Sequence, residues 1–351
     1  MKQRIRFLEA LAGSQTDRIA TTLHNFMPAA VEAGISMHQY REDPSLMAKA
    51  LIEATERYGY DCVLVDMDTV TLAGALGVPV DFPEGEPARS HFPAPFELGD
   101  FRNLPLPKVG DYTYIRNLLE AVRLIKKHFG DEVAVRGNCD QLPFSLACAL
   151  RTPARFFMDL ADANEEGDDS QIFALLDYCW EALRQLMTLM SQTGADILSN
   201  GDSPAGPEIV SPAYYRRYAF PYERKAAALS HELGKPYILH ICGKTDVILA
   251  DMVDTGADGL ELDFKTDIAL AEATLRGRCT FIGNIDPSAV LAMGTPSLVR
   301  SETEKLLQVF AGNPRFILNA GCALPSTTPG ENIQALLACA RPSWNQSLSK
   351  V

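Results

Sequence analysis

Short apolar or β-branched runs alternate with longer amphipathic stretches along most of the chain. Runs that are apolar on both faces are typical of strands in a covered parallel sheet, whereas the stretches between them have the apolar spacing of helices. Eight runs are predicted as strands: 18–23, 62–66, 133–137, 197–200, 237–240, 259–263, 280–283 and 316–319.

Helices are predicted between most of these strands. Many begin with a capping residue or a proline and end near a glycine, which are the usual helix start and stop signals. Clear examples are 43–58, 112–129, 171–192, 212–233, 245–255, 296–310 and 329–340. A further helix is expected over residues 1–17, with Ile5, Leu8, Leu11 and Ala12 on its apolar face.

Repeated alternation of strand and helix predicts a parallel sheet covered by helices. Eight repeats favour a closed (β/α)8 TIM barrel over a doubly wound open sheet. No Gly-x-Gly-x-x-Gly follows the first strand, which weakens the open dinucleotide-binding alternative. We expect one domain over residues 1–351, in which the Pro- and Gly-rich segment 67–111 is an insertion that forms a lid over the barrel mouth.

Composition narrows the class of protein. The chain has 351 residues, 47% of them hydrophobic, and a formal net charge of −13. That charge argues against nucleic acid or an anionic membrane as a partner, because both attract basic surfaces. The basic N-terminus lacks an apolar segment behind it, and no apolar run has the roughly 20 residues of a membrane span. We expect a soluble cytoplasmic protein; the sequence leaves open whether it is a homo-oligomer.

The eight cysteines are too sparse for a disulfide scaffold, so metal binding or catalysis is the more informative use of some of them. Those within apolar segments are predicted to be core residues: Cys62, Cys148, Cys179, Cys279 and Cys339. Cys139 follows a strand and is compatible with either role. Most histidines are predicted to be surface groups, namely His38, His91, His128 and His231, whereas His24 ends a strand and is left open.

Polar side chains follow nearly every predicted strand. In a (β/α)8 barrel the carboxyl ends of the strands form one rim, where the active site lies. The alternative for any single position is a turn or a helix cap, which Asn and Asp commonly form. So many polar strand ends on one rim favour substrate binding, and the residues assigned to it are Asn138, Asp140, Asn200, Asp202, Asn284 and Asp286.

His240 and Cys242 are two residues apart at the end of one strand, so their side chains share a face. Cys322 follows the last strand and reaches the same rim. One His and two Cys form the ligand set of a catalytic zinc site, which keeps its fourth position open. The alternative is a chance His-x-Cys pair with cysteines acting as small buried hydrophobes.

These residues belong to a longer pattern that resembles the uroporphyrinogen decarboxylase superfamily, and within it the zinc-dependent, corrinoid-linked methyltransferases. The matching segments are His240-Ile241-Cys242-Gly243, Gly283-Asn284-Ile285-Asp286-Pro287, Asn319-Ala320-Gly321-Cys322, 201–206 and 328–332. The resemblance implies a (β/α)8 barrel and a zinc ion held by His240, Cys242 and Cys322. It also implies a corrinoid (cobalamin) cofactor, which we expect on a partner protein because no His-containing loop typical of corrinoid carriers is present.

Two departures from the superfamily pattern narrow the activity. Its decarboxylases carry Met-Arg-Gln-Ala-Gly-Arg near the first strand, whereas residues 23–28 read Leu-His-Asn-Phe-Met-Pro. Its thiol-methylating members often carry Glu-Ala-Glu-Ala-Leu-Gly after the second strand, whereas residues 72–77 read Leu-Ala-Gly-Ala-Leu-Gly. The first departure argues against decarboxylation, and the second argues against a thiol acceptor.

The sequence therefore predicts a zinc-dependent methyltransferase that moves a methyl group between a small methylated substrate and the cobalt of a corrinoid protein. A methyl ether is favoured over a methylamine or methylthiol. The alternatives are transfer from the methylcorrinoid to a thiol of the coenzyme M type, a metal-free decarboxylase, and a non-catalytic corrinoid- or tetrapyrrole-binding protein. Asp263 is predicted as the fourth zinc ligand and Glu261 as its alternative, since residues two apart on a strand share a face.

Overall fold

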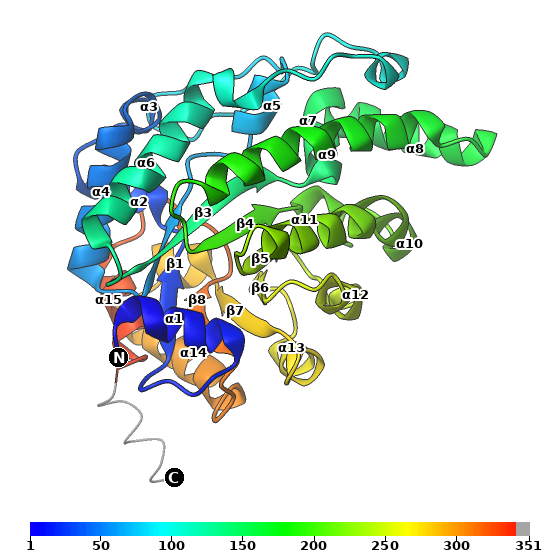
Figure 1. The fold of residues 1–351 in the computed structure, drawn as a ribbon. Helices are drawn as coiled ribbons and strands as arrows, with labels where there is room; N and C mark the ends of the chain where they lie inside the picture. The colour runs from blue at the N-terminus through cyan, green and yellow to red at the C-terminus, as the bar shows by residue number, and fades with distance from the viewer. Residues whose placement is uncertain (342–351) are drawn as a thin grey trace.

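Eight parallel strands close into a barrel in the computed structural model, which describes residues 1–341 (Figure 1). Each strand pairs with the next along the chain, and β8 pairs with β1. The strands are β1 (Ala20–Leu23), β2 (Cys62–Val65), β3 (Ala134–Gln141), β4 (Ile197–Gly201), β5 (Tyr237–Ile241), β6 (Gly259–Leu262), β7 (Thr280–Ile285) and β8 (Phe316–Ala320). The predicted (β/α)8 barrel and its strand order are confirmed.

Helices surround the barrel. The α-helices are α1 (Gln3–Ala12), α2 (Phe26–Glu32), α3 (Met37–Glu42), α4 (Pro44–Tyr58), α5 (Thr71–Ala75), α6 (Thr113–Phe129), α7 (Pro143–Arg151), α8 (Pro153–Glu166), α9 (Ser170–Ser191), α10 (Pro212–Tyr214), α11 (Phe220–Glu232), α12 (Leu249–Asp254), α13 (Ile268–Leu275), α14 (Pro296–Val309) and α15 (Gly330–Ala338). Short 3-10 turns are η1 (Leu98–Arg102), η2 (Val109–Asp111) and η3 (Ser203–Ala205), and π-helical turns are η4 (Tyr215–Ala219) and η5 (Pro287–Ala292).

The predicted helices are present, with two changes. The helix expected over 212–233 is divided by the π-turn η4 into α10 and α11, and the one expected over 245–255 is reduced to α12. Helix α6 illustrates why these segments are helical, because its buried residues Ile115, Leu118, Val122 and Ile125 recur at helical spacing and face the core.

The interior of the barrel is layered, because every second residue of a strand points inward. The lowest layer is apolar and consists of Ala20, Cys62, Ala134, Ile197, Ile238, Ile282 and Ile317. Two residues further along their strands come polar groups, namely Arg136, His240, Glu261 and Asn319. The polar residues of the site therefore stand on an apolar floor that excludes water from below.

Helix α1 closes the amino-terminal end of the barrel. Its residues Phe7, Ala10 and Leu11 belong to the same cluster as the lowest layer of the interior. The sequence correctly predicted a helix here but gave it the wrong length and face. The helix ends at Ala12, before Gly13 with its φ of +82°, and Ile5 is exposed.

The segment 67–111, drawn mostly in cyan at the top of Figure 1, contains α5, η1 and η2. It is anchored by η1, which packs on α9, with the rings of Phe101 and Tyr178 centred 5.4 Å apart. Its role as a lid and the single-domain division stay predictions. Among residues 1–341, no helix combines the length and apolar character needed to cross a membrane.

Replacing Phe7 by Ala should destabilise the protein by about 3 kcal/mol or more, because it leaves a cavity between α1 and the barrel floor. The matched substitution Ile5→Ala, on the exposed face of the same helix, should cost less than about 0.5 kcal/mol. Urea denaturation followed by circular dichroism measures both, and equal midpoints for the two variants would contradict the closing role of α1.

Candidate metal centre

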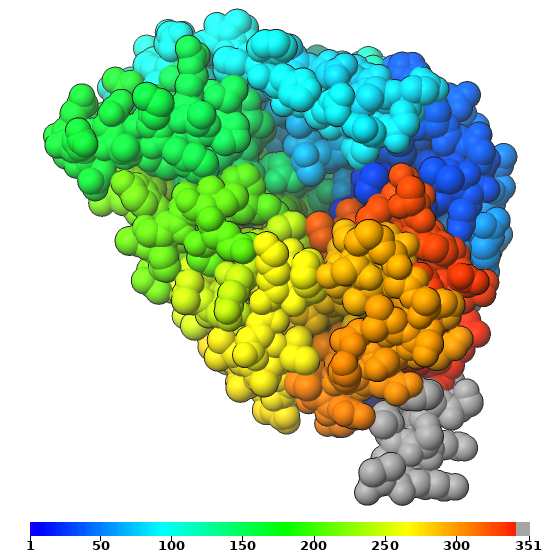
Figure 2. Space-filling model, turned by 180° about the vertical axis from the view of Figure 1, so that it is seen from behind, coloured from blue at the N-terminus to red at the C-terminus, as the bar shows by residue number. Residues whose placement is uncertain are grey.

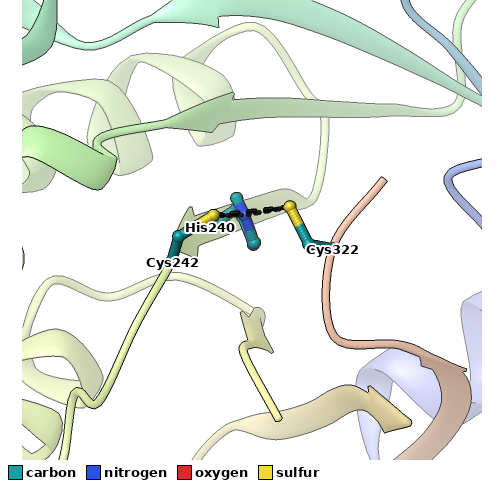
Figure 3. Close-up of side chains that lie close together, drawn as sticks. All are labelled: His240, Cys242 and Cys322. Atoms are coloured by element: carbon teal, nitrogen blue, oxygen red, sulfur yellow. Dashed lines mark hydrogen bonds between the residues drawn. The ribbon is translucent and has the colours of Figure 1, made fainter. Parts of the chain in front are cut away.

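Three side chains from distant parts of the chain point towards one another at the carboxyl ends of the strands (Figure 3). His240 lies on β5, Cys242 directly follows it, and Cys322 lies in the loop after β8. His240 Nε2 is 3.0 Å from Cys242 Sγ and 3.9 Å from Cys322 Sγ, and the two sulfurs are 3.4 Å apart. The structure thus brings together the three residues predicted as zinc ligands.

The three donor atoms fit a tetrahedral zinc ion. Zinc bonds of about 2.3 Å to sulfur and about 2.0 Å to nitrogen separate neighbouring ligand atoms by roughly 3.5–3.8 Å. The observed separations of 3.0, 3.4 and 3.9 Å bracket that range. Sulfur and imidazole donors are also the types that zinc prefers, so closing on an ion needs movements of only a few tenths of an ångström.

The imidazole of His240 is held in the orientation that a metal ligand requires. Its Nδ1 lies 2.9 Å from the carbonyl oxygen of Glu261 and can only donate to it. That bond fixes a proton on Nδ1, so Nε2 is the ring nitrogen that faces the two sulfurs. A backbone carbonyl behind a ligating histidine commonly fixes its tautomer in this way.

A buried charged network lies behind this histidine. Arg136 on β3 donates from Nη2 to Glu261 Oε2 across the barrel at 2.8 Å, and Asn319 on β8 donates to the other carboxylate oxygen. Burial alone would raise the pKa of Glu261, but Arg136 and His240 lower it to about 2. Glu261 is therefore ionised, and its strand is tied to both β3 and β8.

The two cysteines share a hydrogen bond, and they differ in ionisation. This bond, with the nearby His240, lowers the pKa of Cys242 to about 3 against the effect of burial, while the same bond and burial raise the pKa of Cys322. Burial opposes protonation of His240, but Cys242 and Glu261 outweigh it and raise its pKa to about 10. A sulfur ionised at neutral pH is already in the form that binds a cation.

Asp263, predicted as the fourth ligand, is not brought into this group. Its Oδ2 accepts from the backbone N–H of Gly243 at 2.9 Å, and its Oδ1 accepts from that of Lys265 at 3.0 Å. The physical reason is that β6 ends at Leu262, so the alternation of a strand no longer applies at position 263. The alternative, Glu261, faces the Nδ1 side of His240, with Oε2 at 3.8 Å, and not the sulfurs.

The three side chains border a cavity of about 730 Å³ at the barrel mouth. Viewed from behind, the molecule is hollowed where the cyan, green, yellow and red parts of the chain meet (Figure 2). Apolar residues such as Phe26, Met27 and Leu64 share the wall with Arg136 and Glu261. Pro87, Ser90 and His91 of the segment 67–111 also line it, and His91 is exposed, as predicted for a surface group.

Of the six residues predicted to bind substrate, Asn138 and Asn200 line the cavity. The amide of Asn200 is already bonded to Cys139 and Asp140 carbonyls and to the Tyr237 hydroxyl. The other four side chains make hydrogen bonds within the protein. Asp140 accepts from the N–H of Leu72, and Asp202 accepts from the N–H and hydroxyl of Ser145. Asp286 caps η5, and Asn284 donates to the carbonyl of Asp263. The local cap expected from the turn and capping alternative is seen at Asp286, whereas the other three side chains bond to distant segments of the chain.

The sequence analysis assigned no role to several groups that the structure places at the cavity. His24 Nε2 lies 2.7 Å from Asp66 Oδ2, and both residues line the wall. Ser203 Oγ accepts from the backbone N–H of Cys242 at 3.2 Å. Arg136 was overlooked because it sits inside an apolar run; its position two residues after a floor residue, Ala134, was the signal that could have identified it.

Comparison with known proteins decides the family. The family described as Uroporphyrinogen decarboxylase (URO-D) matches residues 2–342. The chain belongs to this family. It is 31% identical over 303 residues to the methylcobamide:CoM methyltransferase MtbA of Methanosarcina mazei, with 85% of each chain covered. It is 27% identical to the methylcobamide:CoM methyltransferase MtaA of Methanosarcina barkeri, with 95% and 96% covered.

These relatives place the chain in the corrinoid-linked methyltransferase branch of the family, so the predicted resemblance is confirmed and the protein is an enzyme of the methyltransferase type. A solved structure of a methyltransferase from Methanosarcina mazei has the same fold, with a TM-score of 0.86, 23% identity and coverage of 97% of this chain and 98% of that one.

The segment 72–77, where thiol-methylating members often carry two glutamates, lies in and after α5. Leu72 is fully buried in the core. A Cβ atom added to Gly74 would lie 2.5 Å from the hydroxyl oxygen of Tyr112. Tyr112 thus occupies the space that a glutamate at position 74 would need. The absence of a glutamate at this position therefore agrees with the packing around α5.

Removing the positive charge of Arg136, which lies behind His240, should lower the free energy of unfolding. Arg136→Met leaves the Glu261 carboxylate ionised, buried and without its partner, for which we expect a loss of about 3–5 kcal/mol. Urea denaturation in a chelator-containing buffer measures it without a contribution from bound metal. Arg184→Met, which breaks the exposed pair with Glu181, should cost less than about 1 kcal/mol. The two variants would denature alike if the Arg136 pair had no structural role.

Proposed function

We propose that this protein is a zinc-dependent methyltransferase that moves a methyl group between the cobalt of a corrinoid held by a partner protein and the heteroatom of a small substrate. The observation that carries the proposal is the meeting of His240, Cys242 and Cys322 at the base of a cavity open to the surface. Family membership supports the corrinoid chemistry, and the set of one imidazole and two thiols supports zinc as the metal.

The residues have distinct parts in this proposal. Bound there, zinc would act as a Lewis acid that stabilises negative charge on the substrate heteroatom. His240, Cys242 and Cys322 would hold it and leave the cavity side free for substrate. Glu261 and Arg136 orient His240 from behind, and Ser203 holds the backbone at Cys242. The apolar wall around Phe26 and Leu64 would lower the polarity around the reacting atoms.

A thiol is the substrate class that we place first, because MtbA and MtaA are named for methyl transfer to CoM. The methyl ether predicted from the sequence is the second candidate. The specific observation in its favour is the α5 segment, where Leu72 is buried and Tyr112 leaves no room for a glutamate at Gly74. Both candidates use the same metal and the same corrinoid, and they differ in the direction of net transfer.

Metal analysis tests the ligand assignment. The parent protein should contain about one zinc ion per chain, and Cys242→Ala or Cys322→Ala should lower the zinc content several-fold, because a three-residue site loses a thiolate. Cys339→Ala, which removes a buried sulfur at the end of α15, is the matched comparison and should keep its zinc. Equal zinc content in all four proteins would refute the site.

Visible spectroscopy tests the reaction. Mixed with methylcobalamin and CoM under anaerobic conditions, the parent protein should convert methylcobalamin to the cobalt(I) form. Cys242→Ala should slow this conversion by roughly 100-fold or more. With cobalt(I) cobalamin and methoxyarenes, the reverse change would support the ether candidate. Absence of both changes, in zinc-replete protein, would contradict the proposed function.

A further inference from the structure

A second pair of reactive groups faces the same cavity. His24 follows β1 and Asp66 follows β2, and His24 Nε2 lies 2.7 Å from Asp66 Oδ2. Counted from the floor residues Ala20 and Cys62, both positions continue the series of inward-facing residues. Both side chains line the wall of the cavity that His240, Cys242 and Cys322 border.

Asp66 is held in place by hydrogen bonds other than the one to the imidazole of His24. Its Oδ1 accepts from the N–H of Met67 at 2.8 Å, and the hydroxyl of Tyr40 donates to its carbonyl at 2.9 Å. A carboxylate can only accept, so the proton of the His24–Asp66 bond is on Nε2. The lone pair of a neutral His24 is then on Nδ1, as in histidines that act as general bases.

Nδ1 of His24 makes no hydrogen bond to the residues that the structure describes, and the His24 side chain is 16% exposed. The backbone carbonyl of His24 accepts from the N–H of Leu324 at 2.8 Å, which holds the loop carrying Cys322 beside the end of β1. His24 and the two sulfurs therefore border the same cavity from neighbouring parts of the rim.

The chemistry of this site requires a place for one proton. Transfer of a methyl group from cobalt to a thiol releases the thiol proton, and demethylation of an ether by cobalt(I) consumes one at the oxygen. The balance is R–XH + CH3–Co(III) ⇌ R–X–CH3 + Co(I) + H⁺, written for either heteroatom X. A group in the cavity wall that accepts or supplies this proton would therefore serve the reaction in both directions.

We propose that His24, oriented by Asp66, is the group that exchanges this proton with the substrate, and that the substrate is a weakly acidic X–H compound such as a thiol or a phenol. This inference rests on the proposed function. In the thiol direction the S–H bond breaks, and the proton passes to Nδ1 of His24. A lone pair of electrons on the substrate sulfur forms the bond to the methyl carbon. The electron pair of the broken cobalt–carbon bond stays on cobalt.

The test compares His24→Gln with the parent on thiols of different acidity. The side-chain amide of this variant can still donate to Asp66 from the position of Nε2, but it cannot take up a proton. With methylcobalamin and propanethiol, a weakly acidic thiol, kcat should fall by roughly 100-fold or more while KM changes little. With thiophenol, which ionises readily without help, the loss should be less than about tenfold. Added imidazole should restore part of the activity of His24→Gly.

A matched control is available on the opposite side of the fold. His231 and Asp258 form an equivalent pair at 2.8 Å, with His231 half-exposed, away from the cavity lining. His231→Gln should retain the parent activity towards both thiols. A second readout needs no corrinoid: propanethiol added to zinc-loaded protein in weak buffer with phenol red should release more protons from His24→Gln than from the parent.

The outcomes separate the two proposals. If the parent transfers methyl groups and His24→Gln loses activity equally on both thiols, or loses none, the role of His24 is refuted and the proposed function stands. Loss of zinc from His24→Gln would also overturn it, since the histidine would then be structural. If zinc-loaded parent protein transfers no methyl group to or from cobalamin, the proposed function fails, and the role of His24 fails with it.

Discussion

The alternation of side chains in a closed parallel barrel is the constraint on which the rest of this molecule depends. Because every second residue points inward, seven of the eight strands each add one residue to an apolar floor, and the next inward residues form the layer above it. Helix α1 seals the floor from below through Phe7 and Leu11. The polar layer can then carry Arg136 and Glu261 with little water, which strengthens their interaction and fixes their geometry firmly enough to orient His240.

Acids in the cavity wall are each matched to a base. Glu261 is paired with Arg136 at 2.8 Å, Asp68 with Arg41 at 3.0 Å, and Asp66 with His24 at 2.7 Å. Buried carboxylates without such partners would be costly in an apolar wall. The pairing lets an acidic protein present a nearly balanced cavity, in which the sulfurs beside His240 are the groups left to attract a cation.

The family takes its name from a decarboxylase and includes named methyltransferases, and this chain departs from the expected decarboxylase pattern at one rim of the barrel. The end of β1 carries His24 in place of the arginines of the decarboxylases, and the ends of β5 and β8 carry the His-x-Cys and Cys donors. All of these lie on strand ends and loops at one rim, where substitutions change chemistry without disturbing the packed floor. Segment α5, by contrast, departs from the thiol-methylating pattern inside the core, at Leu72 and Gly74.

The sequence by itself determined the eight strands, their parallel order and the local pair His240–Cys242, because these depend on the periodicity of short segments. Tertiary structure decided which distant residues meet. Closure brings Cys322 to within 3.4 Å of Cys242, and pairs Arg136 with Glu261 and His24 with Asp66, through strand registers that no local pattern encodes. It also turned Asp263 away to cap a loop, since β6 ends one residue before it.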